Sequence, residues 1–424
     1  MQVAVIGAGY VGLVTAGGLA SLGHHVALAE ADPARLQALE SGEVPIYEEG
    51  LTELVTWGRD SGRLTYHASN SDAVKGAELV LLCLPTPAGV DGRADLSYVR
   101  TVIDELALAL DPNARFVIKS TVPPGTAVEL GKRLANLGSS AVVISHPEFL
   151  REGSAVHDFL HPDRIVIGAH DDADLKAVAS LYDSLATEVI ATDPTSAEMV
   201  KYASNSYLAA RLTFANTLAN LCEAVGADIV DVLEGVGLDH RIGPHFLKPG
   251  PGYGGSCFPK DTLALISVAH DAGYDFRLLK AVIDADDEQR RRIADKVKMA
   301  AGGGLRGRKV AVWGVAFKAG TDDVRESPAS RISRLLVGEG ADVVAYDPEG
   351  RDPDLRHVDS ALAAVEGADV LLVATEWPEF CRVDLAEVAR RMRGYRVVDA
   401  RNLLDPRLVR KAGLDYWGLG RPKA

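Results

Sequence analysis

The chain has 424 residues, which is too long for one ordinary domain and indicates roughly two or three. Its apolar share of 47% and charged share of 25% are ordinary for a soluble globular protein. The net charge of -14 argues against nucleic-acid or anionic-membrane partners, which need basic surfaces, but it leaves room for an anionic small ligand.

The first patterned segment, residues 3–23, carries no charged side chain and is about as long as a membrane span. It also contains six glycines and follows no basic segment. These features favour a buried strand, turn and helix over a membrane span or a signal peptide. We therefore expect no membrane partner.

Short apolar runs then alternate with helical patterns as far as residue 195. Continuous apolar runs suit parallel strands that are buried on both faces, and the intervening segments are long enough for crossover helices. We therefore expect an α/β, doubly wound, Rossmann-like domain over residues 1–195. Its expected strands are Val3–Ile6, Val26–Ala29, Leu79–Cys83, Phe116–Lys119, Val142–Ile144 and Ile165–Ile167.

The sequence Gly7-Ala8-Gly9-Tyr10-Val11-Gly12 follows the first expected strand. The first glycine allows a tight turn, the second lets the backbone approach a pyrophosphate, and the third lets the helix pack closely. Glu30 follows the second strand, at the usual distance for a ligand of the ribose 2′-hydroxyl, and would repel a 2′-phosphate. NAD is thus favoured over NADP as the cofactor. A dinucleotide site is likewise favoured over the alternative, a glycine-rich turn that binds no ligand.

A helical middle segment is expected over residues 196–300. Residues 196–227 form one helical pattern that no Gly or Pro interrupts before Gly226. A stretch rich in Gly and Pro follows over residues 243–259, and a second helical pattern runs from residue 261 to about 300.

The segment from Gly250 to Asp261 is the most unusual of the chain, because five Gly or Pro residues precede Cys257 in it. Such a loop can bring its backbone close to a ligand. Pro259 suits the first turn of a helix, so Cys257 would stand at a helix N-terminus, where the dipole and Lys260 favour a nucleophilic thiolate. Asp261 would face the same side of that helix. The alternative is an inert cysteine buried in a turn.

The inert interpretation is favoured for the other cysteines, which have apolar strand or helix contexts: Cys83, Cys222 and Cys381. The four cysteines form no CxxC pair, so we expect no disulfide framework and no metal site, and we expect a reducing cytoplasm. Lys201 and Asn205 stand four residues apart in the long helical pattern. Without further context, a solvated Lys beside a cap-like Asn is the favoured interpretation of that pair.

After three glycines at 302–304 the strand pattern returns, which indicates a second, smaller α/β domain over residues 301–424. Its expected strands are Val310–Trp313, Asp342–Tyr346, Val370–Val373 and Arg396–Val398. The opening Val310-Ala311-Val312-Trp313-Gly314 is similar to residues 3–7, but the third glycine of the fingerprint is missing. This domain should therefore not bind a dinucleotide in the same way.

These motifs and several longer blocks occur in one order along nearly the whole chain. The longer blocks are Pro45–Glu48, Pro85–Pro87, Ser120–Pro123, Pro147–Gly153, Glu198–Tyr202, Ala316–Pro328 and Asp399–Asn402. In these residues the chain resembles the UDP-glucose 6-dehydrogenase branch of the UDP-glucose/GDP-mannose dehydrogenase family.

The resemblance implies an NAD-binding and a UDP-binding Rossmann-like domain joined by a helical dimerisation segment, and a homodimer or higher homo-oligomer. It implies that UDP-glucose, two NAD and water give UDP-glucuronate and two NADH. The implied catalytic residues are Cys257 as nucleophile, Lys201 as stabiliser of oxygen anions, Asn205 and Asp261 as partners of the C6 oxygen and a water, Glu148 for the hydrolytic water, and Thr121.

Two further sets of residues are expected to contact the ligands. The expected NAD contacts are Gly7, Gly9, Tyr10, Val11, Gly12, Glu30, Arg35, Thr86, Thr121, Glu152 and Arg325. The expected UDP-sugar contacts are Phe149, Leu150, Lys201, Asn205, Arg241 from the partner subunit, Phe246, Lys248, Tyr253, Gly254, Phe317, Lys318 and Arg401.

Three positions depart from the family pattern: Glu30 stands where Asp is usual, His146 where Asn is usual, and Thr217 where an acid is common. None of them alters the implied catalytic residues. The residues around Cys257 look most like the UDP-glucose branch, and the same chemistry on GDP-mannose or a UDP-N-acetylhexosamine is the first alternative. A non-catalytic NAD-binding module and a two-electron dehydrogenase are the others.

Overall fold

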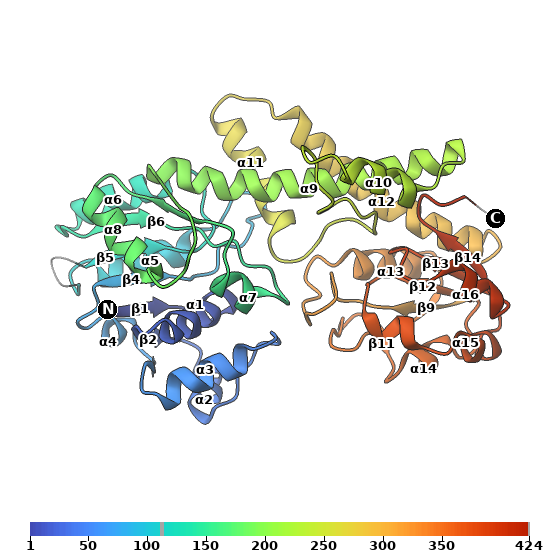
Figure 1. Ribbon diagram of the computed structural model, residues 1–424, viewed down its shortest axis with the longest axis horizontal. Coiled ribbons are helices and arrows are strands. Elements are labelled where there is room, and N and C mark those ends of the chain that lie inside the picture. The colour runs from blue at the N-terminus through green and yellow to red at the C-terminus, as the bar shows by residue number, and fades with distance from the viewer. Residues whose placement is uncertain (111–113, 423–424) are drawn as a thin grey trace. The chain divides into compact units, whose positions relative to one another are not determined.

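The computed structural model describes residues 1–110 and 114–422, which divide into two compact units (Figure 1). The first unit comprises Met1–Ser204 and Leu263–Tyr274, and the second comprises Asn205–Thr262 and the chain from Asp275 onward. No helix among the described residues is both long enough and apolar enough to cross a membrane.

The first unit is built on an eight-stranded sheet in the order β3-β2-β1-β4-β5-β6-β7-β8. The strands are β1 (Gln2–Ile6), β2 (His25–Ala29), β3 (Leu64–His67), β4 (Leu79–Leu82), β5 (Arg115–Ile118), β6 (Val142–Ser145), β7 (Ile165–Gly168) and β8 (Val189–Thr192). Neighbouring strands are parallel except β6 and β7, which meet in an antiparallel pair. The chain reverses its order on either side of β1, as a doubly wound fold does.

Helices cover both faces of this sheet (Figure 1). They are α1 (Tyr10–Ser21), α2 (Pro33–Ser41), α3 (Leu51–Asp60), α4 (Asn70–Ala73), α5 (Ser97–Leu106), α6 (Thr126–Asn136), α7 (Ala155–Leu160), α8 (Asp172–Ala179) and the 3-10 turn η1 (Ser180–Tyr182). Because side chains alternate along a strand, Val3 and Val5 of β1 pack under α1, α3 and α7, whereas Ala4 and Ile6 pack under α4, α5 and α6.

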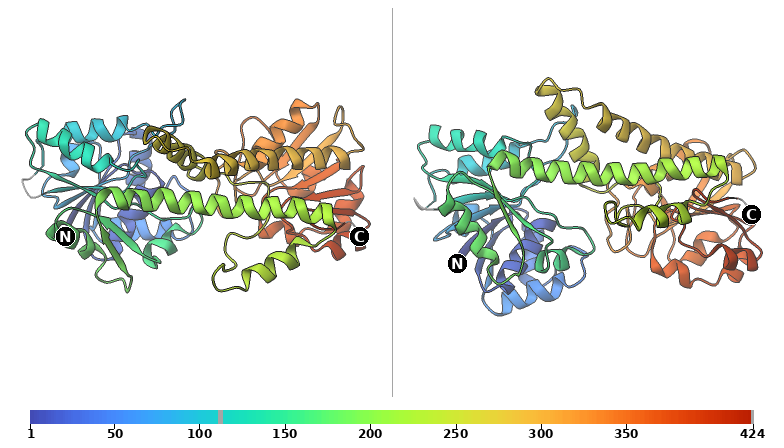
Figure 2. Two further views of the ribbon diagram at one scale, coloured as in Figure 1. Left: turned by 90° about the horizontal axis from the view of Figure 1, so that it is seen from above. Right: turned by 45° about the horizontal axis from the view of Figure 1, so that its top comes forward.

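Four helices form the middle of the chain: α9 (Pro194–Val225), α10 (Ile229–Gly237), α11 (Phe258–Asp271) and α12 (Arg277–Ala300). The long helix expected from residue 196 is confirmed as α9, which Figure 2 shows uninterrupted. The expected single helical stretch from residue 261 to 300 is wrong in one respect. Gly273, at a φ of 73°, ends the first helix, and α12 begins after it.

The second unit carries a six-stranded, wholly parallel sheet in the order β11-β10-β9-β12-β13-β14. Its strands are β9 (Lys309–Trp313), β10 (Asp342–Tyr346), β11 (Arg356–His357), β12 (Val370–Val373), β13 (Arg396–Asp399) and β14 (Asp415–Gly418). The accompanying helices are α13 (Pro328–Gly338), α14 (Ala361–Val365), η2 (Pro378–Arg382), α15 (Leu385–Arg391) and α16 (Pro406–Lys411). The expected fold class, two Rossmann-like α/β units and a long helical segment, is confirmed.

Four strands were not predicted from the sequence, and all four lie at the edges of the sheets: β3 and β8 in the first, β11 and β14 in the second. Edge strands keep polar, partly exposed residues, so they lack the continuous apolar run of a central strand. The expected apolar context of Cys381 is also wrong, because its side chain lies exposed in η2.

Candidate functional site

The glycine turn after β1 has room for a ligand at one of its three positions. A Cβ on Gly7, whose φ is 98°, would lie 2.7 Å from the carbonyl oxygen of Cys83. A Cβ on Gly12 would lie 1.8 Å from the carbonyl oxygen of Gly7. Around Gly9, the N-cap of α1, no atom lies within 4 Å of the added Cβ. The open backbone at the start of α1 therefore fits the pyrophosphate of NAD.

Glu30 lies beside this turn, at the end of β2. Its carboxylate accepts hydrogen bonds from the backbone N–H groups of Ala8 at 3.2 Å and Asp32 at 2.7 Å. Arg35 stands 3.6 Å from the same carboxylate. The acid is thus held next to the glycine turn, as the expectation for Glu30 requires.

Tyr10 connects the glycine turn to the segment around Glu152. Its hydroxyl donates to the buried carboxylate of Glu48, which also accepts from the N–H groups of Gly153 and Ala155, each at 2.6 Å. Neighbouring Val11 is half-buried.

Two buried threonines lie beyond β4 and β5 in the same unit. The hydroxyl of Thr86 donates to the carbonyl oxygen of Thr121 at 2.8 Å. The structure therefore brings these two expected NAD contacts together.

Lys201 of α9 and Glu148 form a buried ion pair, with Nζ and Oε1 2.9 Å apart. Burial works to raise the pKa of Glu148, but Lys201 and the N–H of Leu150, at 2.6 Å, outweigh it and hold that pKa below its ordinary value. The ring of Phe149 lies 5.3 Å from the ammonium of Lys201. A solvated Lys201 is therefore the wrong interpretation, since only 3% of the residue is exposed.

Lys119, directly after β5, is a second buried cation, and the sequence predicts it only as the last residue of a strand. Burial lowers the pKa of Lys119 to about 8. Its ammonium lies 3.3 Å from Nε2 of His146, which also meets the hydroxyl of Tyr182 at 2.7 Å. Nδ1 of His146 faces the carbonyl oxygen of Val166 at 2.8 Å, so Nδ1 carries the proton and Nε2 accepts. The departure at position 146 thus has a complete set of partners.

Cys257 directly precedes α11, as expected, because the N–H of Asp261 donates to its carbonyl oxygen at 3.0 Å. The thiol is half-buried, and its sulfur lies 3.6 Å from the hydroxyl of Ser256. Asp261 is fully buried and accepts from Asn205 Nδ2 and from Lys260 Nζ, each at 2.6 Å. The second unit therefore brings Cys257, Asp261 and Asn205 into one neighbourhood.

Residues of the second sheet's loops adjoin the glycine-rich loop before Cys257. A Cβ on Gly255 would lie 2.9 Å from the ring of Phe317, and one on Gly250 would lie 3.0 Å from the guanidinium of Arg401. Arg401 in turn donates to the carbonyl oxygen of Phe317 at 3.0 Å. Gly254 is similarly tight, because its Cβ would lie 2.5 Å from the carbonyl oxygen of Glu326.

The remaining expected ligand contacts lie at the surface of the second unit or near it. Arg241 and Arg325 have exposed side chains that pair with Asp239 and Asp323, each at 2.6 Å. Lys248 is exposed, and Lys318 is half-buried. Phe246 and Tyr253 each lie 6.3 Å from the ring of Phe258. Among the described residues, no group of three or more His, Cys, Asp or Glu side chains could hold a metal ion.

Several buried polar residues next to these groups were not predicted from the sequence. Lys119 gave one signal, a cation that ends an apolar run. Glu48 lies in a block that supported the family resemblance but received no role. Asp286 and Arg290 of α12 gave none, because charged residues on a long helix are usually solvated.

Three family models match consecutive parts of the chain. They describe the NAD-binding domain, the central domain and the UDP-binding domain of the UDP-glucose/GDP-mannose dehydrogenase family, over residues 1–186, 195–288 and 311–406.

Relatives match over the whole length. A UDP-glucose 6-dehydrogenase of Rhizobium meliloti is 42% identical, with 100% of each chain covered. The structure of a UDP-glucose dehydrogenase from Pyrobaculum islandicum superposes with a TM-score of 0.91 at 38% identity, covering 99% of this chain and 97% of that one. A UDP-D-ManNAc dehydrogenase from Pyrococcus horikoshii gives 0.90 at 30% identity, covering 99% of each. The chain, with its NAD-binding domain, belongs to the UDP-glucose/GDP-mannose dehydrogenase family of NAD-dependent oxidoreductases.

Proposed function

We propose that the chain catalyses the NAD-dependent, four-electron oxidation of UDP-glucose to UDP-glucuronate, with Cys257 bound covalently to C6 in mid-reaction. The observation that carries the proposal is the half-buried thiol at the N-terminus of α11, beside the buried Asp261 and Asn205 pair. The relative from Rhizobium meliloti, 42% identical, carries the corresponding name.

The reaction begins when the C6 alcohol loses a hydride and a proton and becomes an aldehyde. The sulfur of Cys257 adds to C6 and the carbonyl oxygen takes up a proton, which gives a thiohemiacetal. Loss of a second hydride and proton leaves a thioester. Water then attacks C6, the C–S bond breaks, and the thiol is regenerated with the carboxylate. NAD, when bound, accepts the hydride in each oxidation.

The other expected catalytic side chains suit these steps. The buried ammonium of Lys201 can donate to each oxygen anion that develops at C6. Glu148 stays ionised because its pKa is lowered, so it can accept a hydrogen bond from the hydrolytic water and orient it. Asp261 fixes the amide of Asn205, because the carboxylate must receive the NH₂ group and Oδ1 then faces away from it. Thr121 supplies a further polar contact to the site where C6 reacts.

The proposed NAD contacts begin with the glycine turn after β1. Gly9 leaves the backbone open at the start of α1 for a pyrophosphate, and Glu30 can accept a hydrogen bond from the ribose 2′-hydroxyl. Tyr10, Thr86 and Glu152 would complete the cofactor site. For the sugar nucleotide we propose the residues around the Cys257 loop, with Phe317 and Arg401 in contact with it.

The nucleotide sugar is the open part of the proposal. The relative from Pyrococcus horikoshii, named for a UDP-N-acetylated sugar, is 30% identical, below the 42% of the UDP-glucose relative. A panel of UDP-glucose, GDP-mannose and UDP-N-acetylhexosamines, scored by NADH released per sugar, decides between them. Two NADH per UDP-glucose support the proposal, and turnover of another sugar alone contradicts it. Absence of NADH with every sugar would favour a non-catalytic NAD-binding module, and one NADH per sugar a two-electron dehydrogenase.

A homodimer through α9 is the proposed assembly. Tyr207, Phe214 and Leu221 recur every seventh residue on α9, so they lie near one face, and each is more than half exposed, at 64%, 57% and 55%. An apolar stripe of this kind is costly in water unless it is covered. Arg241, whose side chain is 77% exposed, would then be available to a partner's substrate site.

The dimer is tested by the molar mass of the protein in light scattering. Phe214→Glu should convert the dimer to a monomer, because a charge at the centre of an apolar contact is costly. Leu408→Glu is the matched control, since Leu408 on α16 is also 55% exposed and lies outside the stripe. A dimeric Phe214→Glu variant would contradict an interface on this face.

We also propose a cytoplasmic location and the domain boundaries at residues 195/196 and 300/301.

The covalent step is tested with Cys257→Ala, for which Cys381→Ala is the matched control. The first variant should form no uronate yet bind NAD with unchanged affinity, whereas loss of the exposed Cys381 should leave turnover intact. A normal uronate yield from Cys257→Ala would refute covalent catalysis.

Lys201→Ala should lower turnover by about 10²–10³-fold, as the loss of an oxyanion donor does. Because Glu148 loses its partner in this variant, thermal unfolding must be measured beside turnover. A loss of less than about tenfold in a folded variant would remove Lys201 from the mechanism.

A further inference from the structure

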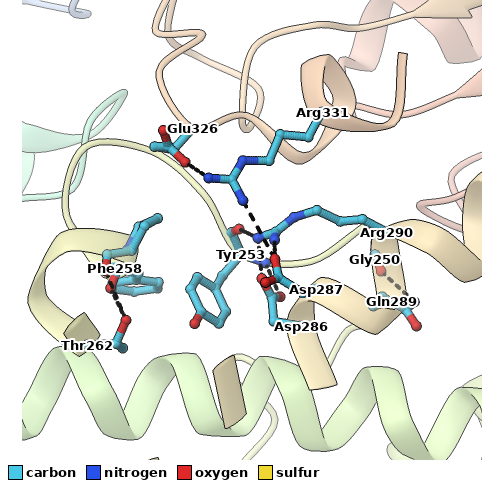
Figure 3. A network of polar contacts seen from close by, with 11 residues as sticks. Gly250, Tyr253, Phe258, Thr262, Asp286, Asp287, Gln289, Arg290, Glu326 and Arg331 are labelled. Atoms are coloured by element: carbon cyan, nitrogen blue, oxygen red, sulfur yellow. Dashed lines mark hydrogen bonds and ion pairs between the residues drawn. The ribbon is translucent and has the colours of Figure 1, made fainter. Parts of the chain in front are cut away.

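The loop that ends at Cys257 is attached to α12 by an ion pair that the proposed mechanism does not use (Figure 3). The pair consists of Asp286 and Arg290, one helical turn apart on α12, and both are buried, with 1% and 6% of each residue exposed. A buried ion pair of this kind is weak evidence for stability, because its desolvation offsets its attraction. The burial of this pair therefore needs an explanation other than stability, and its hydrogen bonds to the loop supply one.

The pair holds both backbone groups of one loop residue. The N–H of Tyr253 donates to Asp286 at 2.9 Å, and the carbonyl oxygen of Tyr253 accepts from Arg290 at 2.9 Å. Arg290 also bonds to Asp287, which meets Arg331 of α13 at 3.6 Å, so the guanidinium is held from two sides. The backbone at position 253 is therefore bonded to two side chains, and one of them, Arg290, has a further ionic partner in Asp287.

A second pair of contacts holds the start of the loop. The N–H of Gly250 donates to Asn216 at 2.7 Å, and its carbonyl oxygen accepts from Gln289 at 2.9 Å. Gln289 in turn accepts from Asn220 at 2.9 Å. An irregular buried loop cannot satisfy its own peptide groups, and here α9 and α12 supply the partners at two points.

The glycine between these two points permits the attachment. Gly252 has a φ of 114°, and a Cβ there would lie 2.8 Å from Oδ1 of Asp286. A glycine at position 252 therefore lets the carboxylate of Asp286 come close to the loop backbone. Burial raises the pKa of Asp286 to about 6, so its charge is kept at an energetic cost.

The side chain of Tyr253 connects the loop to the first residue of α11. Its ring lies 6.3 Å from that of Phe258, the residue after Cys257, in an edge-to-face arrangement. The hydroxyl of Thr262, one turn on, donates to the carbonyl oxygen of Phe258 at 2.8 Å. Cys257 therefore lies between a fixed Tyr253 and a fixed first turn of α11.

We propose that Asp286 and Arg290 are positioning residues, which hold the Gly250–Cys257 loop so that the thiol stands at the N-terminus of α11 before substrate arrives. A nucleophile that is placed in advance loses no free energy to ordering in the reaction. The role in catalysis rests on the proposed function of Cys257, but the placement of the thiol does not. Neither residue is assigned a contact with substrate or cofactor.

Asp286→Ala removes the acceptor of the Tyr253 N–H, whereas Asp286→Asn keeps an oxygen at that place. Glu288→Ala is the matched control, because it removes an exposed acid from the same helix. We expect kcat for uronate formation to fall on the order of 10- to 100-fold in Asp286→Ala. The KM for UDP-glucose and the Kd for NAD should stay within about twofold, and Asp286→Asn should recover most of kcat.

A second measurement needs neither substrate nor cofactor. Alkylation of Cys257 by iodoacetamide is followed by mass spectrometry across pH, with the exposed Cys381 of the same molecule as the internal reference. In Asp286→Ala the midpoint for Cys257 should lie roughly half a pH unit above that in Asp286→Asn, because both variants lack the carboxylate charge but only the first also loses the acceptor that keeps the thiolate aligned with the helix dipole. The midpoint for Cys381 should not move.

The outcomes separate this inference from the proposed function. If the wild-type protein forms no uronate but the Cys257 midpoint still differs between the two Asp286 variants, the function fails and the positioning role stands. If uronate forms normally and Asp286→Ala matches Glu288→Ala in kcat and Asp286→Asn in midpoint, the positioning role is overturned. Should Asp286→Ala not fold, Arg290→Lys keeps the charge beside Asp286 but shortens the reach to the Tyr253 carbonyl. That variant must raise the midpoint above that of the wild-type protein, and an unchanged midpoint overturns the role.

Discussion

The two sheets have the same strand order around their first strand, yet the turn after that strand differs. In the first sheet, α1 begins at Tyr10, four residues after β1 ends at Ile6. In the second sheet β9 ends at Trp313, and the next helix begins only at Pro328. The first turn therefore presents the N–H groups of a helix start to a ligand, and the second does not.

The acids that follow the second strand of each sheet reinforce this difference. Among the described residues, the carboxylate of Glu30 accepts hydrogen bonds only from the N–H groups of Ala8 and Asp32, and Arg35 stands 3.6 Å away. Asp347 is fully buried and is saturated by five donors, which are the N–H groups of Val315, Ala316, Glu349 and Gly350 and the indole of Trp377. The same topology thus yields a turn that is open around Gly9 in one sheet and a closed, self-bonded turn in the other.

The largest effect should come from a methyl group at the tight glycines of the two turns. Gly12→Ala and Gly314→Ala should each lower the free energy of unfolding by about 3–4 kcal/mol. The added Cβ would lie 1.8 Å from the carbonyl oxygen of Gly7 in one case and 2.3 Å from the side chain of Thr375 in the other. Urea unfolding measures both, and Gly338→Ala, with open space around it, is the control. Wild-type stability in either variant would contradict the described packing.

Removal of Asp347 should affect mainly stability, whereas removal of Glu30 should affect mainly cofactor binding. Asp347→Ala should cost about 3 kcal/mol of stability or more, because it leaves several buried donors without an acceptor. Glu30→Ala should cost about 1 kcal/mol or less, since water can replace its contacts, but it should weaken discrimination against NADP. Chemical unfolding and NAD and NADP titrations check this pair. Equal stability losses would show that the second acid is no more structural than the first.

Buried charges beyond the strands give a pH-dependent test. Lys119 follows β5, and Asp399 ends β13, which has the same place in the second sheet. Burial lowers the pKa of Lys119 to about 8 and raises that of Asp399 above its ordinary value, so each folded site disfavours charge. Lys119→Met should therefore raise stability at pH 7, by roughly 2–3 kcal/mol.

The sign of the pH dependence follows from proton binding. Between about 8 and the ordinary lysine pKa near 10.4, unfolded Lys119 binds more protons than the folded form, so wild-type stability gains with rising pH and the advantage of Lys119→Met shrinks. Urea unfolding from pH 7 to pH 10 measures this, with Lys176→Met on the exposed face of α8 as the control. A difference that stays constant over that range would contradict the lowered pKa of Lys119, because it would mean that folding does not shift the titration of its ammonium.

The smallest effect is expected at Gly9, the open position of the first turn. Gly9→Ala should leave stability within about 0.5 kcal/mol, because no atom lies within 4 Å of the new Cβ. It should still weaken NAD binding by about tenfold or more, since the methyl group would stand where the pyrophosphate approaches. Calorimetric titration with NAD decides, and an unchanged affinity would move the phosphate site away from Gly9.

Sequence alone was sufficient for the elements whose signal is local. The apolar central strands, the glycine turn before α1, the uninterrupted α9 and the cysteine before α11 all follow from periodicity and from Gly and Pro positions. The edge strands β3, β8, β11 and β14 did not, because a strand with one neighbour has no need of a continuous apolar run. The roles of the expected site residues stay a prediction.

Only the tertiary structure decided which polar groups are buried and what they face. Lys201 on its helix pattern could be solvated, and it became a buried partner of Glu148 only through packing. Asp286 and Arg290 looked like an ordinary charged helix face, yet they hold the backbone of Tyr253. Periodicity records whether a side chain faces the interior, whereas its hydrogen-bond partner comes from a distant segment whose approach depends on the whole fold.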